Sequence, residues 1–348
     1  MLANNDLCGK HTKVFSFIVM SVAFGFFVVY YAMKMSQPNL FCDPGPYIYA
    51  TFHDEAANIL KYSRNGCLLD AEVLSGTPDY AISSHRIELR SLTFGTFKGK
   101  EVLYVVDAYS ADSYLAIYGQ CDKDGKRDFI SSPVSTVTNP GVNHPYGIAF
   151  DPDGNVYLSS QHTDNVLRFT KDTFKPMELP PNMEYNKKYD YYPGTFIQFG
   201  EPNLHPTSEQ GIRDIITVND KMWVANEDDN SVRVIDIATG LVENIITVET
   251  PIGMHYHHST GMVFVSSKGP KHQGYVSSFS VESKQRLQIY KSKKMTHPTG
   301  IATHKTTLYV ANQKLGQIVS FNIRSGRFLK VIVNDMPHGI EKILISDC

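Results

Sequence analysis

A loosely repeated pattern of strand-forming segments runs through most of this 348-residue chain. One cycle has a short Pro-x-Gly-Ile opening, a strand resembling Val-Tyr-Val-Ala-Asn, a polar loop, a third strand, and a turn that leads to a fourth. A repeat of roughly 40–50 residues with strand chemistry is typical of stacked β-units, because each unit buries its apolar face only against its neighbours. We therefore expect a ring of β-blades.

Two cycles carry the pattern most clearly. Residues 144–151 read HPYGIAFD and lead to strands at 155–160 and 165–169, and the next cycle has strands at 222–226 and 231–237. The first cycle is similar to NHL repeats, and the second resembles YVTN repeats. This resemblance implies a β-propeller. It implies no particular activity, because these families share an architecture much more than a chemistry.

The two ends of the chain set the number of blades. Residues 47–52, 58–62 and 67–73 look like second, third and fourth strands without a first, whereas residues 336–340 read as an opening strand shortly before the chain stops. Pairing the C-terminal strand with the N-terminal three completes a sixth blade and leaves no free sheet edge. We predict an all-β, six-bladed propeller over residues 44–348, with a β-sandwich as the alternative.

Glycines mark the beginning of the cycles, where a sharp turn at a crowded axis favours a residue without a side chain. The interval between Gly147 and Gly211 is too long for one blade. Residues 174–194 are rich in Pro and Tyr, and we interpret them as a loop inserted between a third and a fourth strand. The spacing glycines are Gly147, Gly211, Gly253, Gly300 and Gly339.

An uncharged apolar run precedes the repeats. Residues 14–33 could cross the roughly 30 Å hydrocarbon core at about 1.5 Å per residue. Lys10 and Lys13 precede this run, which predicts a cytoplasmic tail at 1–13, a transmembrane signal anchor at 14–33 and a stalk at 34–43. We therefore expect a single-pass membrane protein with an extracellular or lumenal propeller. A cleaved signal peptide is the alternative.

Cysteine usage is compatible with that location. Four cysteines lie beyond the apolar run, and four cysteines allow three pairings. The sequence does not choose among these pairings. Ring closure brings Cys348 near the first blade, where Cys42 and Cys67 lie, and a disulfide that ties it there would suit an oxidising compartment. The fourth of these cysteines is Cys121.

The charge of the chain bears on its partners. Lys and Arg number 33 against 35 acidic residues, which gives a net charge of −2. No basic stripe is present, so we do not expect nucleic acid as a partner. The membrane, a protein, a peptide or a small molecule remain as expected partners.

Polar residues gather in the loops that a propeller places around one mouth of its channel. Loops between second and third strands, and between blades, contain many of the chain's His, Asp and Asn residues. We predict that these form a ligand-binding rim, for which the candidates are His53, Asp107, His162, Asn226 and Asn312. Histidines expected on the same rim are His53, His144, His162, His205, His272, His297 and His338.

Such a rim could also hold a metal ion, since imidazole suits zinc and carboxylate or amide oxygens suit calcium. His338, His144 and His297 are the candidate ligands, and His338 is expected nearest the axis because it is the x of Pro-x-Gly. Residues 336–338 also resemble the metal-histidine strand of peptidyl-hydroxyglycine amidating lyases. These lyases and the regucalcin and gluconolactonase-like hydrolases are architectural relatives that bind a metal at this position.

The resemblance to these metalloenzymes is incomplete. The lyases usually have Asp after the metal histidine, where this chain has Gly339, and neither their other ligand segments nor the calcium-binding Glu of the lactonases has a clear match. The alternative is that His-Pro-x-Gly simply begins a blade. No nucleophile elbow, HExxH, CxxC, Walker loop or dinucleotide fingerprint is present. The sequence thus favours a binding module, with a metal-dependent hydrolase or lyase as the alternative.

Overall fold

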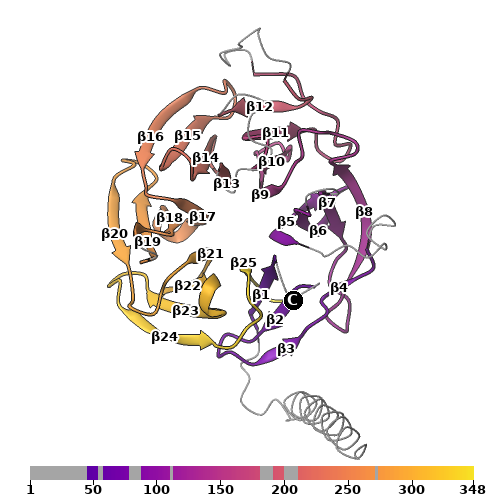
Figure 1. Cartoon of the computed structure of the whole chain (residues 1–348). Coiled ribbons are helices and arrows are strands. Elements are labelled where there is room, and N and C mark those ends of the chain that lie inside the picture. The colour runs from indigo at the N-terminus through magenta and orange to yellow at the C-terminus, as the bar shows by residue number, and fades with distance from the viewer. Residues whose placement is uncertain are drawn as a thin grey trace, which may run out of the picture. The chain divides into compact units, whose positions relative to one another are not determined.

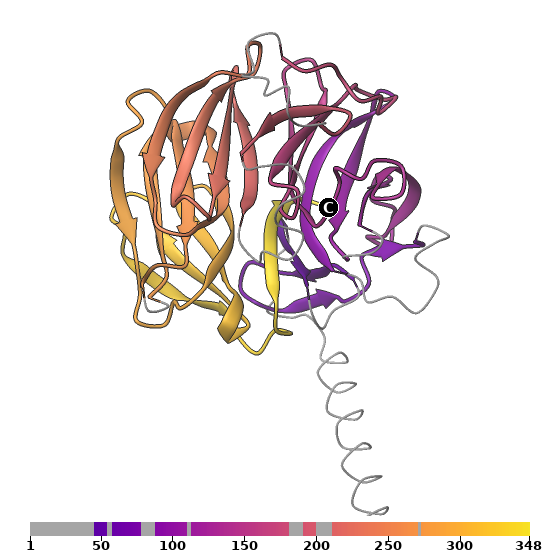
Figure 2. The same cartoon turned by 45° about the horizontal axis from the view of Figure 1, so that its top comes forward.

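The computed structural model describes residues 45–53, 58–77, 88–109, 113–180, 191–199, 211–270 and 273–348, and these form a ring of six β-sheets (Figure 1). Each sheet is one blade, with its first strand nearest the axis and its last strand outside. The prediction of a six-bladed propeller is confirmed. Figure 2 shows the ring from another side, with the strands of each blade twisted against one another.

The first blade combines the two ends of the described chain. In blade I, β25 pairs antiparallel with β1, and Tyr47 faces Ser346 in this register. The prediction that the C-terminal strand closes the first blade is confirmed. Its order from the axis outward is β25 (Ile340–Ser346), β1 (Tyr47–Phe52), β2 (Leu60–Tyr62), β3 (Leu68–Asp70).

Two blades depart from the simple four-stranded plan. Blade II gains the short parallel strand β4 (Leu74–Ser75) outside β8 and contains β5 (Leu89–Phe97), β6 (Lys100–Asp107), β7 (Tyr114–Tyr118), β8 (Arg127–Ser135). Blade III has a long connection, residues 170–194, before its last strand. It contains β9 (Pro145–Phe150), β10 (Val156–Ser160), β11 (Asn165–Phe169), β12 (Thr195–Gln198).

The remaining three blades are built from consecutive strands. Blade IV contains β13 (Ile212–Val218), β14 (Lys221–Asn226), β15 (Ser231–Asp236), β16 (Val242–Thr247). Blade V contains β17 (Pro251–His257), β18 (Met262–Ser267), β19 (Tyr275–Ser280), β20 (Arg286–Tyr290), with the 3-10 turn η2 (His258–Thr260) after β17. Blade VI contains β21 (Pro298–His304), β22 (Thr307–Asn312), β23 (Gln317–Asn322), β24 (Phe328–Val333), with η4 (Gln313–Leu315) after β22.

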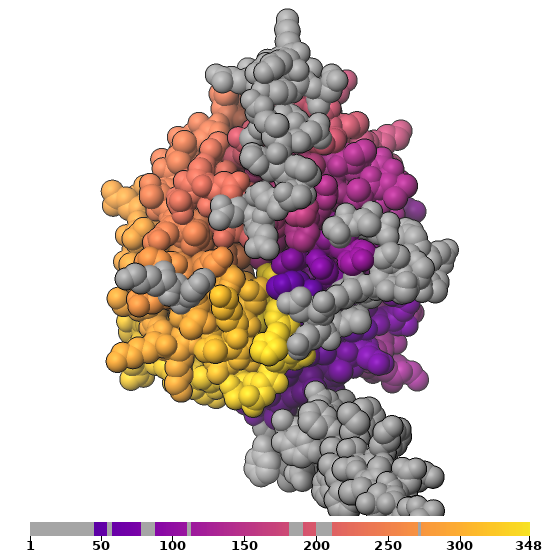
Figure 3. Space-filling view, in the orientation of Figure 1, coloured from indigo at the N-terminus to yellow at the C-terminus, as the bar shows by residue number. Residues whose placement is uncertain are grey.

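The hydrophobic core is divided among the junctions between blades. Each of six buried clusters combines residues of two neighbouring blades, as Trp223 of blade IV does with Phe279 of blade V. This arrangement follows from the alternation of strands, because successive side chains point to opposite faces of a sheet and each face meets a different neighbour. The blades therefore pack closely side by side around the axis (Figure 3).

The spacing glycines have two different roles. A Cβ atom on Gly300 would lie 2.5 Å from the Glu341 carbonyl oxygen of the next inner strand, and one on Gly253 would lie 2.2 Å from that of Thr299. These glycines allow inner strands to approach one another closely. Gly211 and Gly339 instead adopt positive φ angles, of 122° and 79°, in the loops before their strands.

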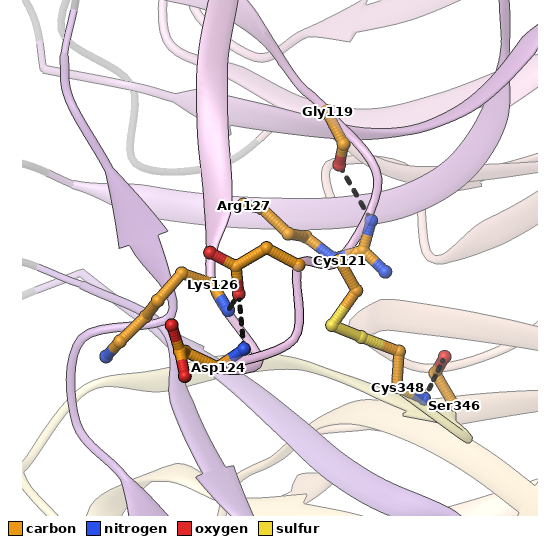
Figure 4. The surroundings of a disulfide bond; sticks show 8 residues. Gly119, Cys121, Asp124, Lys126, Arg127, Ser346 and Cys348 are labelled. Carbon is orange, nitrogen blue, oxygen red and sulfur yellow. Dashed lines mark hydrogen bonds between the residues drawn. A yellow bond between two sulfur atoms is a disulfide. The ribbon is translucent and has the colours of Figure 1, made fainter.

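A disulfide joins Cys121 to Cys348, with a Cα–Cα distance of 6.2 Å (Figure 4). Cys121 lies between β7 and β8, so the C-terminus is tied to blade II. The expectation that Cys348 is tied to the first blade is wrong. Cys348 follows the end of β25, and the β7–β8 connection of the neighbouring blade lies beside that end.

The predicted membrane anchor is not covered by the structure. The segments 1–13, 14–33 and 34–43, together with Cys42, lie outside the described residues. In the ranges that are described, no helix is both long and apolar enough to cross a bilayer.

Candidate functional site

Strand register places one side chain from every blade at the mouth of the channel. In each blade, the last residue of the second strand pairs with a residue of the inner strand, and the next residue on the inner strand faces the axis. We call this set the mouth ring: Arg90, Tyr146, Arg213, Ile252, Thr299 and Glu341.

A second set lies directly above the mouth ring. The residue that follows each second strand donates its backbone N–H to the carbonyl of the residue just before the pairing position on the inner strand, at 2.9–3.2 Å. All six blades repeat this hydrogen bond, so the loops are held in the same way around the ring. We call this set the loop ring: His53, Ala108, Gln161, Glu227, Lys268 and Gln313.

The two rings enclose a cavity of about 310 Å³. All six residues of the mouth ring and four of the loop ring line it. Its other lining residues are Glu88, His144 and His297, which precede inner strands, and His162. Almost all of its lining thus comes from three equivalent positions of each blade: the mouth ring, the loop ring and the residue that precedes the inner strand.

Glu341 is the centre of a buried hydrogen-bond network in this cavity. It is 3% exposed and accepts hydrogen bonds from Arg90 Nη1 at 2.6 Å, Gln313 Nε2 at 2.7 Å and the Tyr146 hydroxyl at 2.7 Å. His53 Nδ1 lies 2.8 Å from the same carboxylate. Burial opposes ionisation, but Arg90 and the other donors outweigh it and hold the pKa of Glu341 well below its usual range.

A second ion pair lies across the cavity from Glu341. Arg213 Nε donates to Glu227 Oε2 at 2.6 Å, and its Nη1 donates to Gln161 Oε1 at 2.9 Å. Lys268 Nζ lies 3.9 Å from the other Glu227 oxygen. Burial disfavours the charged guanidinium, yet Glu227 raises the pKa of Arg213 above its ordinary value. Arg213 therefore stays charged and paired with Glu227.

Three histidines of the cavity, His144, His162 and His297, are held in the neutral form. Burial, with Arg90 as the next cause, lowers the pKa of His144 to about 2, and Arg90 Nη2 lies 3.1 Å from His144 Nε2. His162 stacks on His144 with ring centroids 4.4 Å apart, and burial lowers its pKa too. Burial lowers the pKa of His297 to about 4. Neutral imidazoles each offer one donor and one acceptor.

An ion pair crosses the channel beneath the mouth. Lys342 Nζ of β25 pairs with Asp214 Oδ2 of β13, and these strands belong to blades on opposite sides of the ring (Figure 1). Asp214 is 1% exposed and also accepts the Met254 backbone N–H at 2.8 Å. A Cβ atom on Gly147 would lie 2.9 Å from Asp214 Oδ1, so this glycine leaves room for the pair.

Three of the candidate rim residues anchor loops instead of lining the cavity. Asp107, Asn226 and Asn312 each end a second strand and are almost fully buried. Asp107 accepts the Tyr109 N–H at 3.0 Å and Asn312 accepts the Thr296 N–H at 3.1 Å, each through Oδ1. Burial raises the pKa of Asp107 to about 6. The sequence pattern found the loops correctly, but these side chains point back into the loop backbone.

Some of the candidate histidines line the cavity and others do not. His53, His162, His144 and His297 line one cavity, whereas His338 is exposed and is not among its lining residues. The placement of His338 nearest the axis is wrong, because β25 pairs through Ile340 and thus presents Glu341 to the mouth. His205 and His272 lie outside the described residues.

Sequence reasoning missed the residues that dominate the electrostatics of the cavity. Arg90, Arg213 and Glu341 belong to inner strands that lack a regular Pro-x-Gly at the pairing position. A usable signal was the apolar residue that precedes each of them: Leu89, Ile212 and Ile340 stand where other blades have Pro145, Pro251 and Pro298.

The arrangement does not match a metal centre. Among the residues that the structure describes, no group of three or more His, Cys, Asp or Glu side chains could hold an ion. The guanidinium of Arg90 beside His144 would also repel a cation there. The cavity is instead suited to forming hydrogen bonds with a ligand.

Comparison with known proteins supports the fold alone. No protein-family model matches the chain, and no curated protein has a similar sequence. The crystal structure of a nidogen/laminin complex contains a chain with a TM-score of 0.59 and 10% identity, covering 86% of this chain and 98% of that one. A protein of unknown function from Bacteroides caccae has a TM-score of 0.54 at 15% identity, with the same coverage of each chain.

Proposed function

We propose that this chain is a membrane-tethered binding module that takes a small uncharged polar ligand, rich in hydroxyl or amide groups, in its mouth cavity. The volume of about 310 Å³ is at the lower end of the range for small-molecule sites. The proposal depends on one observation: the charged side chains of this cavity are already paired with one another.

The charges around the cavity compensate one another. The cations Arg90, Arg213 and Lys268 line the cavity with the acids Glu88 and Glu341. Glu227, just outside the lining, contacts both Arg213 and Lys268. The four pairing contacts between Arg90 and Glu341 and between Arg213, Glu227 and Gln161 already satisfy the strongest groups. An ionic ligand would have to break these pairs, whereas a neutral ligand can bind beside them.

Side chains with both donor and acceptor groups surround this network. The neutral imidazoles of His144, His162 and His297 and the amides of Gln161 and Gln313 are of this kind. Hydroxyl and amide groups of a ligand also combine both functions. The mouth therefore matches such a ligand in chemistry as well as in size.

The enzymatic alternative has less support in the cavity. A general base should have a pKa near the working pH, but Glu341 is held ionised by its donors. Asp107, whose pKa is closer to neutral, is buried among loop N–H groups and does not line the cavity. Neither of these two carboxylates is thus both accessible and suited to accept a proton.

The location of the module is part of the proposal. The uncharged run at 14–33 favours a membrane anchor, and the Cys121–Cys348 disulfide favours an oxidising compartment for the propeller. We therefore place the propeller on the extracellular or lumenal side. One of the similar structures is of a complex between nidogen and laminin, so the fold is also compatible with a ligand group carried by a protein.

A ligand panel tests the proposal. The full chain in detergent is screened by saturation-transfer NMR against neutral mono- and disaccharides, neutral dipeptide amides, and charged analogues of each. We expect saturable binding of a neutral compound that His162→Ala abolishes. His257→Ala is the matched control, since His257 lies at the far end of β17 from the mouth. Preferential binding of the charged analogues, or equal binding by His162→Ala, would refute the proposal.

A further inference from the structure

A second cavity lies at the end of the ring opposite the mouth. It has a volume of about 490 Å³ and is formed by the turns after β13, β17 and β19, between blades IV and V. Since β13 begins at the mouth with Ile212 and ends at Val218, which lines this cavity, the two cavities lie at opposite ends of the blade. No residue lines both.

The chain's single tryptophan forms part of this second cavity. Trp223 lies on β14 and is fully buried, and its indole N–H has no hydrogen-bond partner in the part of the chain that the structure describes. Buried indole N–H groups usually find an acceptor. Tyr256, on β17, adds a second aromatic side chain to the wall. Tyr256, which is only partly buried, is thus the aromatic side chain open to a ligand, while the buried Trp223 closes the wall from within.

A lysine lies over this aromatic surface. Lys284 Nζ is 5.3 Å from the Trp223 ring centroid and donates a hydrogen bond to the Val281 carbonyl. Among the described residues, no carboxylate lies within ion-pairing distance of Lys284. Burial lowers its pKa. The Lys284 ammonium group can donate three hydrogen bonds, and the Val281 carbonyl accepts one of them.

The acids near the cavity have other partners or face water. Lys221 Nζ pairs with Asp220 at 3.3 Å, with Asp236 at 2.7 Å and with Glu243 at 2.8 Å. Glu282 is exposed at the edge. Within the described part of the chain, Lys284 therefore has no direct ion pair next to the aromatic wall, and Glu243 and Asp220 act on its pKa only from farther away.

We propose that this cavity is a second binding site, for a small aromatic carboxylate whose ring packs against Tyr256, beside the buried Trp223, and whose carboxylate pairs with Lys284. The ring adds apolar contact to a surface that already holds two aromatic side chains. The carboxylate supplies a direct ion pair, in addition to the one Val281 carbonyl that Lys284 already has as an acceptor. The site is independent of the mouth cavity and does not rest on the function proposed for it.

The single tryptophan gives a direct readout. The full chain in detergent is titrated with benzoate, and tryptophan emission is followed with excitation where benzoate does not absorb. We expect a saturable change with benzoate and about tenfold or weaker affinity for the neutral analogue benzamide, because a charge-assisted hydrogen bond is lost. Benzylamine, which carries the opposite charge, should bind more weakly still.

Three lysine variants test the assignment of the charge. Lys284→Met should lower benzoate affinity about tenfold or more, whereas Lys284→Arg should retain most of it. Lys330→Met is the matched control, since Lys330 is exposed on β24 of another blade. Absence of a saturable benzoate response, equal affinities for benzoate and benzamide, or a preference for benzylamine in the unmodified chain would each overturn the proposal, even if a variant failed to fold.

Discussion

Blades VI and I show that the same Pro-x-Gly motif can occupy different structural positions. Blade VI is one continuous piece of chain, and its Pro298-Thr299-Gly300 lies on the inner strand with Thr299 at the mouth. Pro337-His338-Gly339 has the same pattern in the chain that leads to blade I, but the strand there pairs through Ile340. The mouth position falls to Glu341, three residues later. Strand register, and not the glycine motif, decides which side chain reaches the axis.

The two inner strands also differ in what they place beside the axis. Gly300 leaves room for the backbone of Glu341 and Lys342, whereas Lys342, at the equivalent position of blade I, extends across the channel to Asp214. In blade VI, Gly300 thus leaves space beside the axis. In blade I, the equivalent residue Lys342 is charged and extends into the channel. The closing blade thus adds Glu341 to the mouth and Lys342 beneath it, next to the arginines that blades II and IV supply.

The largest expected effect concerns the Cys121–Cys348 disulfide, which ties down the end of blade I. Blade VI is one continuous piece of chain. Replacing both Cys121 and Cys348 by Ser should lower the free energy of unfolding by roughly 5 kcal/mol, because the bond closes a long loop in the unfolded chain. Chemical denaturation of the purified chain measures this. A loss below about 1 kcal/mol would show that strand pairing alone secures the closing blade.

Equivalent mouth positions give the next largest difference. Glu341→Ala should cost about 3–5 kcal/mol in the free energy of unfolding, because it leaves the buried Arg90 guanidinium without its partner. Thr299→Ala, the matched change in blade VI, removes one hydrogen bond to the Ile340 carbonyl and should cost about 1–2 kcal/mol. Denaturant midpoints of the two variants compare them. Equal costs would contradict the special role of blade I.

Gly300→Ala tests the space that the regular blade provides. The added Cβ would lie 2.5 Å from the Glu341 carbonyl oxygen and 2.6 Å from the Ile343 nitrogen, both of them backbone atoms. We expect a loss of about 1–3 kcal/mol, measured by thermal unfolding. Gly119→Ala is the matched control, because its φ is not positive and an added Cβ would lie 3.6 Å from the Asp128 carbonyl oxygen, an ordinary contact. An unchanged melting temperature would show that the inner strands can move apart.

The smallest effect is expected at His338, the motif residue of the closing blade. Its side chain is exposed, so His338→Ala should change the free energy of unfolding by less than about 0.5 kcal/mol. Binding of the mouth ligand should also be unchanged. A marked loss of affinity in the same NMR assay would return His338 to the functional site.

The fold could be predicted because its signals are local and repeated. Alternation in segments such as 231–237 marks strands, and the surplus opening strand at one end of the chain matches the missing one at the other. Ring closure follows, since an unpaired edge on β1 would otherwise remain. The insertion in blade III was visible as a Pro- and Tyr-rich interruption between β11 and β12.

The cavity could be predicted only in part because it depends on register and on distant partners. The loops that contain His53, His144, His162 and His297 were found correctly. Nothing local in the sequence shows that Glu341 contacts Arg90, which lies 251 positions away. The partner of Cys348 was likewise open, because cysteine spacing does not determine which blades are neighbours.

The covalent bond between Cys121 and Cys348 has a consequence for a chain that is cut by a protease. Any single break in the peptide backbone between these two residues yields two fragments that remain joined through sulfur. This holds for a cut at any position from the end of β7 to the C-terminus, which is most of the propeller. A nick in the long connection of blade III would therefore be visible on a gel only after a reducing agent is added.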